Sequence, residues 1–102
     1  MPHRRNKLEV QQKFGVILRE AINARYGQTV SSTRLSDEFN LRAVGTTTIS
    51  RQTALKWLKG EAFPDPGRLR VLAEWLNLDL NEIFKSQVYR TFNESKLPHG
   101  EG

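Results

Sequence analysis

The chain has 102 residues, with 16 Lys and Arg against 11 Asp and Glu, a formal net charge of +5 at pH 7. A hydrophobic fraction of 37% supports one small domain with short tails. The lack of cysteine excludes disulfides, thiolate metal sites and a cysteine nucleophile in this chain. His3 and His99 lie near opposite ends of the chain, so we expect no metal site.

No run of about 18 apolar residues is present, so we expect no transmembrane helix. The basic start, residues 1–7, is followed by polar residues rather than by the apolar core of a signal peptide. We therefore expect a cytoplasmic protein with no membrane partner.

The positive charge is unevenly distributed along the chain. Residues 42–70 carry six basic and two acidic groups, whereas residues 71–102 carry three basic and five acidic groups. A basic middle segment suggests an anionic partner such as nucleic acid. The alternative is a solvated face, because a net charge of +5 is modest.

The first predicted helix covers residues 9–26 and ends at Gly27. Residues 1–8 are expected to form a separate basic N-terminal arm, which either is disordered or contacts a DNA minor groove. Apolar residues at helical spacing define the buried face of the helix: Val10, Phe14, Ile17, Leu18, Ala21 and Ile22.

A shorter second helix is expected after the polar stretch 28–32, with Ser31 or Ser32 as its N-cap. Leu35 and Phe39 lie four residues apart and should face the core. Residues 40–48 contain Gly45 and three threonines, which disfavour a helix, so a loop is predicted there.

The third helix is expected to begin after the N-cap Ser50 and to end at Gly60. Ala54, Trp57 and Leu58 form its predicted apolar back.

Asp65 and Pro66 open a fourth helix, whose core stripe is Leu69, Leu72, Ala73 and Leu76. Asp79 and Glu82 form a capping box for a fifth, short helix. The sequence thus predicts a compact all-α domain of five helices over residues 9–86. The tail 87–102 follows, in which Val88, Tyr89 and Phe92 form a candidate dimer surface before a disordered end.

The front of the third helix has the chemistry of a DNA-reading surface. Arginine can make two hydrogen bonds to guanine, glutamine two to adenine, and lysine reaches guanine or phosphate. The first turn, residues 50–52, offers free backbone N–H groups and the positive end of the helix dipole to a phosphate. The residues opposite the apolar back are Arg51, Gln52, Leu55, Lys56 and Lys59.

Residues 49–60, with the sequence ISRQTALKWLKG, resemble the recognition helix of the Cro/repressor-type (XRE) helix-turn-helix family. Residues 35–39 look like the family's second helix and residues 64–84 like its fourth and fifth, so the resemblance covers roughly residues 12–85. It implies a five-helix repressor-like domain. It also implies a bacterial or phage transcriptional regulator that binds double-stranded DNA as a homodimer.

The resemblance also implies roles for individual residues. Arg51 and Gln52 would contact base edges, Lys56 a base or a phosphate, and Leu55 a thymine methyl group. Ser32, Ser50 and Lys59 would hold the DNA backbone. The connection before the recognition helix is longer than the family's usual turn of about three or four residues. It either contacts the DNA backbone through Arg42 and Thr46 to Thr48, or folds away from the DNA.

We expect no enzyme activity, no cofactor and no small-molecule substrate. Glu74, Asp79 and Glu82 are helix-end charges with no histidine or cysteine nearby in sequence, and no phosphate-binding glycine loop is present. The alternative function is a protein-interaction module, antitoxin-like or polymerase-contacting, on a helix-turn-helix scaffold. Such a module would bind its partner through residues 88–92 or through Leu55.

Overall fold

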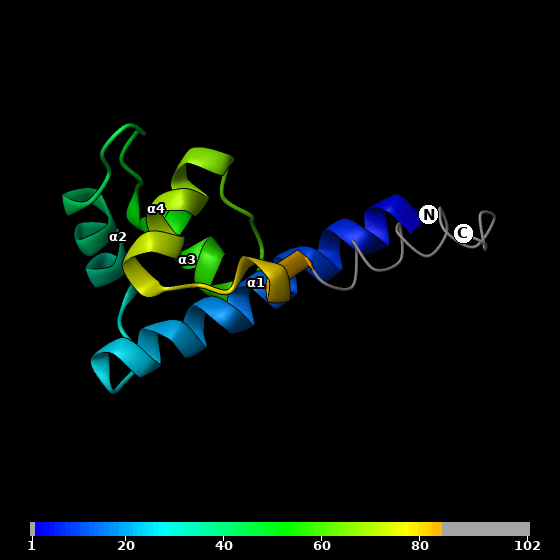
Figure 1. Cartoon of the computed structure of the whole chain (residues 1–102), viewed down its shortest axis with the longest axis horizontal. Coiled ribbons are helices and arrows are strands. Elements are labelled where there is room, and N and C mark those ends of the chain that lie inside the picture. Colours follow the sequence, from blue (N-terminus) through cyan, green and yellow to red (C-terminus); the bar gives the residue numbers. More distant parts are fainter. Residues whose placement is uncertain (1, 85–102) are drawn as a thin grey trace.

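The computed structural model describes residues 2–84, with side chains from Leu8 onward. Four helices follow one another there: α1 (Pro2–Tyr26), α2 (Ser32–Leu41), α3 (Arg51–Lys59) and α4 (Pro66–Leu76) (Figure 1). A fifth helical segment covers residues 80–84 and reaches the end of the described part. The prediction of an all-helical chain is therefore confirmed for residues 2–84, which contain no strand.

Two further expectations concern the membrane and the tail. Within residues 2–84 no helix combines the length and the apolar character needed to cross a bilayer. The predicted dimer surface, Val88, Tyr89 and Phe92, lies outside the described residues.

Helix α1 begins at Pro2, seven residues before the start expected at Glu9. The segment predicted as a separate arm is thus continuous with the helix. Proline is tolerated in a first helical turn, and the Arg, Lys, Leu, Glu and Gln residues that follow are good helix formers. The first half of α1 projects beyond the cluster formed by the other helices (Figure 1).

The helix N-termini are fixed by side-chain caps. Ser31, Ser50 and Asp65 each adopt an extended backbone and accept a hydrogen bond from the N–H three residues later. Asp79 Oδ1 accepts from the Glu82 N–H at 3.2 Å in the same way. Of the two residues predicted as alternative N-caps of α2, Ser31 and Ser32, Ser31 is the cap.

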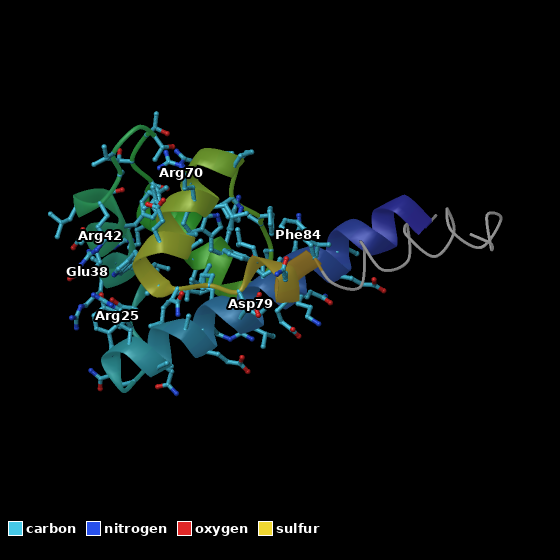
Figure 2. All side chains as sticks on the ribbon, in the orientation of Figure 1. Arg25, Glu38, Arg42, Arg70, Asp79 and Phe84 are labelled. Carbon is cyan, nitrogen blue, oxygen red and sulfur yellow. The ribbon has the colours of Figure 1, made fainter. Side chains whose placement is uncertain are left out.

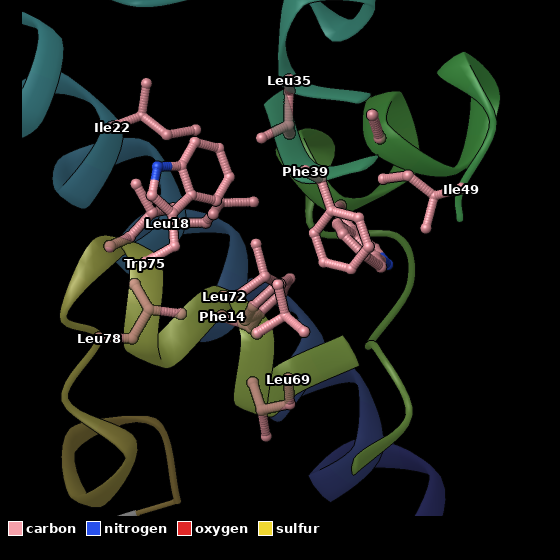
Figure 3. Packing of buried hydrophobic residues seen from close by; sticks show 14 of the residues in the cluster. Phe14, Leu18, Ile22, Leu35, Phe39, Ile49, Leu69, Leu72, Trp75 and Leu78 are labelled. Carbon is pink, nitrogen blue, oxygen red and sulfur yellow. The ribbon is translucent and has the colours of Figure 1, made fainter. Parts of the chain in front are cut away.

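The core is organised around Trp57, which is 1% exposed. Its ring meets Phe14 of α1 edge-on at 6.3 Å between centroids and Phe39 of α2 at 5.5 Å. Aromatic pairs in this geometry add about 0.5–1.5 kcal/mol beyond the area that they bury. Figure 3 shows other core side chains from α1, α2 and α4, among them Leu18, Ile22, Leu35, Leu69 and Leu72.

Helices α1 and α3 touch through two glycines. A Cβ atom on Gly15 would lie 2.8 Å from Gly60 Cα and 2.9 Å from Gly60 N, so only glycine fits there. Gly60 also has a φ of 72°, the left-handed conformation that ends α3. The close contact fixes the C-terminal end of α3 against the middle of α1.

Candidate nucleic-acid interface

Helix α3 is buried on one side and exposed on the other. Ala54 and Trp57 are buried among α1 and α2, and Leu58 is half-buried, as the sequence predicts. Five side chains at helical spacing point away from the core, and we call them the outer face of α3. They are Arg51, Gln52, Leu55, Lys56 and Lys59, all exposed.

Both ends of α3 are firmly held. At the N-terminus, Ser50 Oγ accepts from the Thr53 N–H at 3.1 Å. At the C-terminus, the Glu61 N–H donates to Lys56 O at 2.8 Å, and Arg19 of α1 donates to Leu58 O. These bonds satisfy the groups that a helix leaves unpaired at its ends. Both ends of this nine-residue helix are thereby bonded to the rest of the fold or capped, while its outer face is exposed.

The charge of the outer face is uncompensated. Arg51, Lys56 and Lys59 make no ion pair within the described part of the chain, and α3 contains no acidic residue. The caps add to this contrast, because α2 and α3 are capped by neutral serines whereas α4 is capped by the carboxylate of Asp65. An anion is therefore attracted to α3 more strongly than to the start of α4.

The connection from Arg42 to Ser50, here called the 42–50 connection, is closed at its base. Asn40 of α2 donates from Nδ2 to Ile49 O at 3.0 Å, and its Oδ1 accepts from the Ile49 N–H at 2.8 Å. Ile49 is buried, with 7% of its surface exposed. The residues between Asn40 and Ile49 thus form a compact loop whose two ends lie side by side.

The 42–50 connection also contacts the first turn of α4. Arg68 Nη2 donates to Thr47 Oγ1 at 2.7 Å and to Thr48 O at 2.8 Å. Gly67 leaves room for Thr46, since a Cβ atom there would lie 3.1 Å from Thr46 Oγ1. In Figure 1 this loop stands out beyond the end of α2, beside α4. These contacts hold the 42–50 connection against the first turn of α4.

Arg42, a predicted DNA-backbone contact, has partners within the fold. Its Nη1 donates to Glu38 O at 2.7 Å and to Glu38 Oε1 at 2.9 Å. Its guanidinium carbon lies 4.6 Å from the centre of the Trp75 ring. Figure 2 shows Arg42 next to Glu38 at the end of α2. These contacts engage the guanidinium of Arg42 within the fold, which argues against the predicted contact with the DNA backbone.

The remaining predicted site residues take different positions. Ser32 is the first residue of α2, directly after the cap, and is half-buried. Thr48 is exposed, two residues before the cap of α3, and its carbonyl oxygen accepts from Arg68. Leu55 is 39% exposed in the middle of the outer face. The structure thus gathers Arg51, Gln52, Leu55, Lys56 and Lys59 on one face and keeps Ser50 and Thr48 at its start.

Sequence reasoning missed Asn40 and Arg68, which position the start of α3 from two sides. The signal for Asn40 was its place at the end of a helix before a long loop, where an amide can bond backbone groups. Arg68 follows the Asp65 cap by three residues, and its contact with Thr47 joins segments that are distant in sequence. No local pattern predicts such a contact.

A hollow of about 380 Å³ lies between the loop and α4, lined by Arg42, Val44, Arg70, Val71, Glu74 and Trp75. Figure 2 shows Arg70 on this side of α4. Within the described residues no three His, Cys, Asp or Glu side chains come together as a candidate metal site. The outer face of α3 differs from this hollow in gathering three cations and an amide on one exposed surface.

Comparison of the chain with protein-family models, with curated proteins and with solved structures gives no significant match.

Proposed function

We propose that this chain is a sequence-specific regulator that binds double-stranded DNA and places α3 in the major groove. The proposed fold class is the five-helix repressor-like helix-turn-helix domain. The observation that carries the proposal is the outer face of α3, which is basic and exposed, on a helix whose other side is buried. Its cations form no ion pair with any side chain that the structure describes. An α-helix of this width fits the major groove of B-DNA.

Binding would begin with the phosphates, because these contacts fix the orientation of the protein on the duplex. Ser32, Ser50 and Lys59 are the proposed backbone contacts, joined by the exposed Thr48 at the start of α3. The neutral caps Ser31 and Ser50 leave the positive ends of α2 and α3 available to phosphate oxygens.

Base discrimination is assigned to the outer face itself. Arg51 and Gln52 lie in the first turn of α3 and can each make paired hydrogen bonds to a purine edge, worth roughly 1–3 kcal/mol per pair. Lys56 lies one turn further along and contacts a base or a phosphate. Leu55 lies between them and packs on a thymine methyl group.

A helix of nine residues covers only a short stretch of sequence, so we propose that the protein binds as a homodimer. A two-fold dimer would place two copies of α3 about one helical turn of DNA apart, roughly 34–36 Å.

Selection of bound duplexes from a random pool at about 100 mM salt tests this function. The proposal predicts a two-fold motif with half-sites about ten base pairs apart. It also predicts that affinity falls on the order of 10³-fold between 50 and 200 mM salt for about six phosphate contacts. A pool that stays random would overturn it.

A second candidate function, a protein-interaction module, is favoured by one observation. Leu41, the last residue of α2, and Val44, in the loop that follows, are 77% and 76% exposed. Exposed aliphatic side chains in one place are typical of a protein contact. Binding through them would change little between 50 and 200 mM salt, which separates this candidate from DNA binding.

A further inference from the structure

The residues just before α3 are held from two sides by side chains outside the outer face. From α2, Asn40 makes two hydrogen bonds to the backbone of Ile49. From α4, Arg68 bonds the side chain of Thr47 and the backbone of Thr48. Ser50, the cap of α3, follows directly. The direction in which α3 leaves the connection is thus set jointly by α2 and α4.

Arg68 is itself oriented by the first turn of α4. Its backbone N–H donates to Asp65 Oδ1 at 2.9 Å, and its Nη1 lies 3.7 Å from Asp65 Oδ2. Its Nε also donates to Thr47 O at 3.4 Å. The guanidinium therefore has partners on each of its three nitrogens, and only 24% of the side chain is exposed. A side chain so engaged is poorly placed to neutralise a phosphate.

We propose that Arg68 is a positioning residue for DNA recognition, acting through Thr47 and Thr48 on the first turn of α3; this inference rests on the proposed function. The base-contacting residues Arg51 and Gln52 lie in that turn. Side chains that form paired hydrogen bonds with bases require a backbone held to about 0.5 Å, which supporting contacts provide. Loss of Arg68 should therefore weaken discrimination between sequences rather than the general attraction to DNA.

Arg70 provides a matched control. It carries the same charge, lies two residues further along α4 and is exposed. It makes no ion pair or side-chain hydrogen bond within the described residues, although its Nη2 lies near Gly45. Arg68→Ala and Arg70→Ala thus remove equal charge from one helix, and only the first removes hydrogen bonds to Thr47 and Thr48.

The first measurement is binding of the full chain to the duplex that it selects and to a scrambled duplex, at several salt concentrations. For Arg68→Ala we expect the ratio of the two affinities to fall about tenfold, the loss of one partly formed base contact. The two variants should show the same dependence of affinity on salt, and Arg70→Ala should keep the wild-type ratio. A wild-type ratio in Arg68→Ala, with a salt slope reduced by about one, would overturn the proposal, because it would indicate a direct phosphate contact.

The second measurement does not use DNA. Amide hydrogen exchange reports on the N–H groups of Thr53 and Ala54, which bond to Ser50 in the first turn of α3. Arg68→Ala should accelerate their exchange at least severalfold relative to Arg70→Ala. Equal exchange in the two variants would overturn the positioning role even if the protein binds DNA specifically. Faster exchange in a protein that prefers no duplex would overturn the proposed function, and with it the role in recognition.

Thr47→Val is the variant to use if Arg68→Ala does not fold. It removes the hydroxyl acceptor of Arg68 and leaves every charge in place. We expect a smaller loss in the same direction, about twofold to threefold in the affinity ratio, with an unchanged salt slope. An unchanged ratio together with unchanged exchange at Thr53 would contradict the proposal.

Discussion

The side-chain amide of Asn40 is paired with both backbone groups of Ile49, donating to its O at 3.0 Å and accepting from its N–H at 2.8 Å. This pair joins the end of α2 to the start of α3, although the chain between them makes a long excursion. The pair therefore holds the end of α2 next to the start of α3, while Arg68 of α4 contacts Thr47 and Thr48. Asn40 and Ile49 are thus in direct contact although they lie nine residues apart in the sequence.

Asn40→Ala should lower the free energy of unfolding by about 2 kcal/mol, because it leaves the buried N–H and C=O of Ile49 without partners. Urea denaturation monitored by circular dichroism measures the change. Asn23→Ala is the control, since Asn23 is an exposed residue of α1 and its replacement should be neutral or slightly stabilising. Equal stability of Asn40→Ala and wild type would contradict the importance of the pair.

Gly15→Ala should lower the free energy of unfolding by about 1–3 kcal/mol, since its new Cβ would meet the backbone of Gly60 at 2.8 Å and force α1 and α3 apart. In a helix without such a contact, the same change would stabilise by up to about 1 kcal/mol. Thermal or urea denaturation therefore tests the close packing of α1 and α3 through the sign of the change in the free energy of unfolding. A more stable variant would show that the two helices do not pack this closely.

The sequence predicts the helices of this domain well, because caps, stop signals and apolar spacing are local. Helix α3 begins after Ser50 and ends at Gly60, and α4 begins after Asp65, as predicted. Ala54 and Trp57 face the core, also as predicted. The start of α1 was placed too late, since its first turns carry no apolar stripe and only their helix-forming residues indicate the helix.

The candidate site was predictable only in part. The exposed face of α3 follows from helical spacing, so its residues could be assigned from the sequence. Arg42 was predicted to contact the DNA backbone, and no local pattern around Arg68 indicates its contacts. Their partners, Trp75 and Thr47, lie 33 and 21 residues away in the chain, and such contacts depend on tertiary packing. Sequence spacing alone does not separate a cation engaged in the fold from one that is free.

Arg42→Ala should lower the free energy of unfolding by about 1–2 kcal/mol, through loss of the contact with the Trp75 ring and of the bonds to Glu38. We expect no change in the salt dependence of DNA binding, because its guanidinium is engaged within the fold. Arg70→Ala, which removes the same charge without an aromatic contact, is the comparison for stability. A reduced salt slope with unchanged stability would instead make Arg42 a phosphate contact.

The proposed function assigns the discrimination between DNA sequences to the first turn of α3. The most direct test is the double variant Arg51→Ala with Gln52→Ala, measured on the selected duplex and on a scrambled one. Both side chains are exposed and make no side-chain hydrogen bond within the described residues, so the far-ultraviolet circular dichroism spectrum should not change. The control is Arg25→Ala with Gln28→Ala, which removes the same charge at an exposed place far from α3 in the sequence. We predict that the affinity ratio falls close to one in the double variant and stays at its wild-type value in the control. A folded double variant that keeps the wild-type ratio would contradict the assignment of α3 as the reading helix.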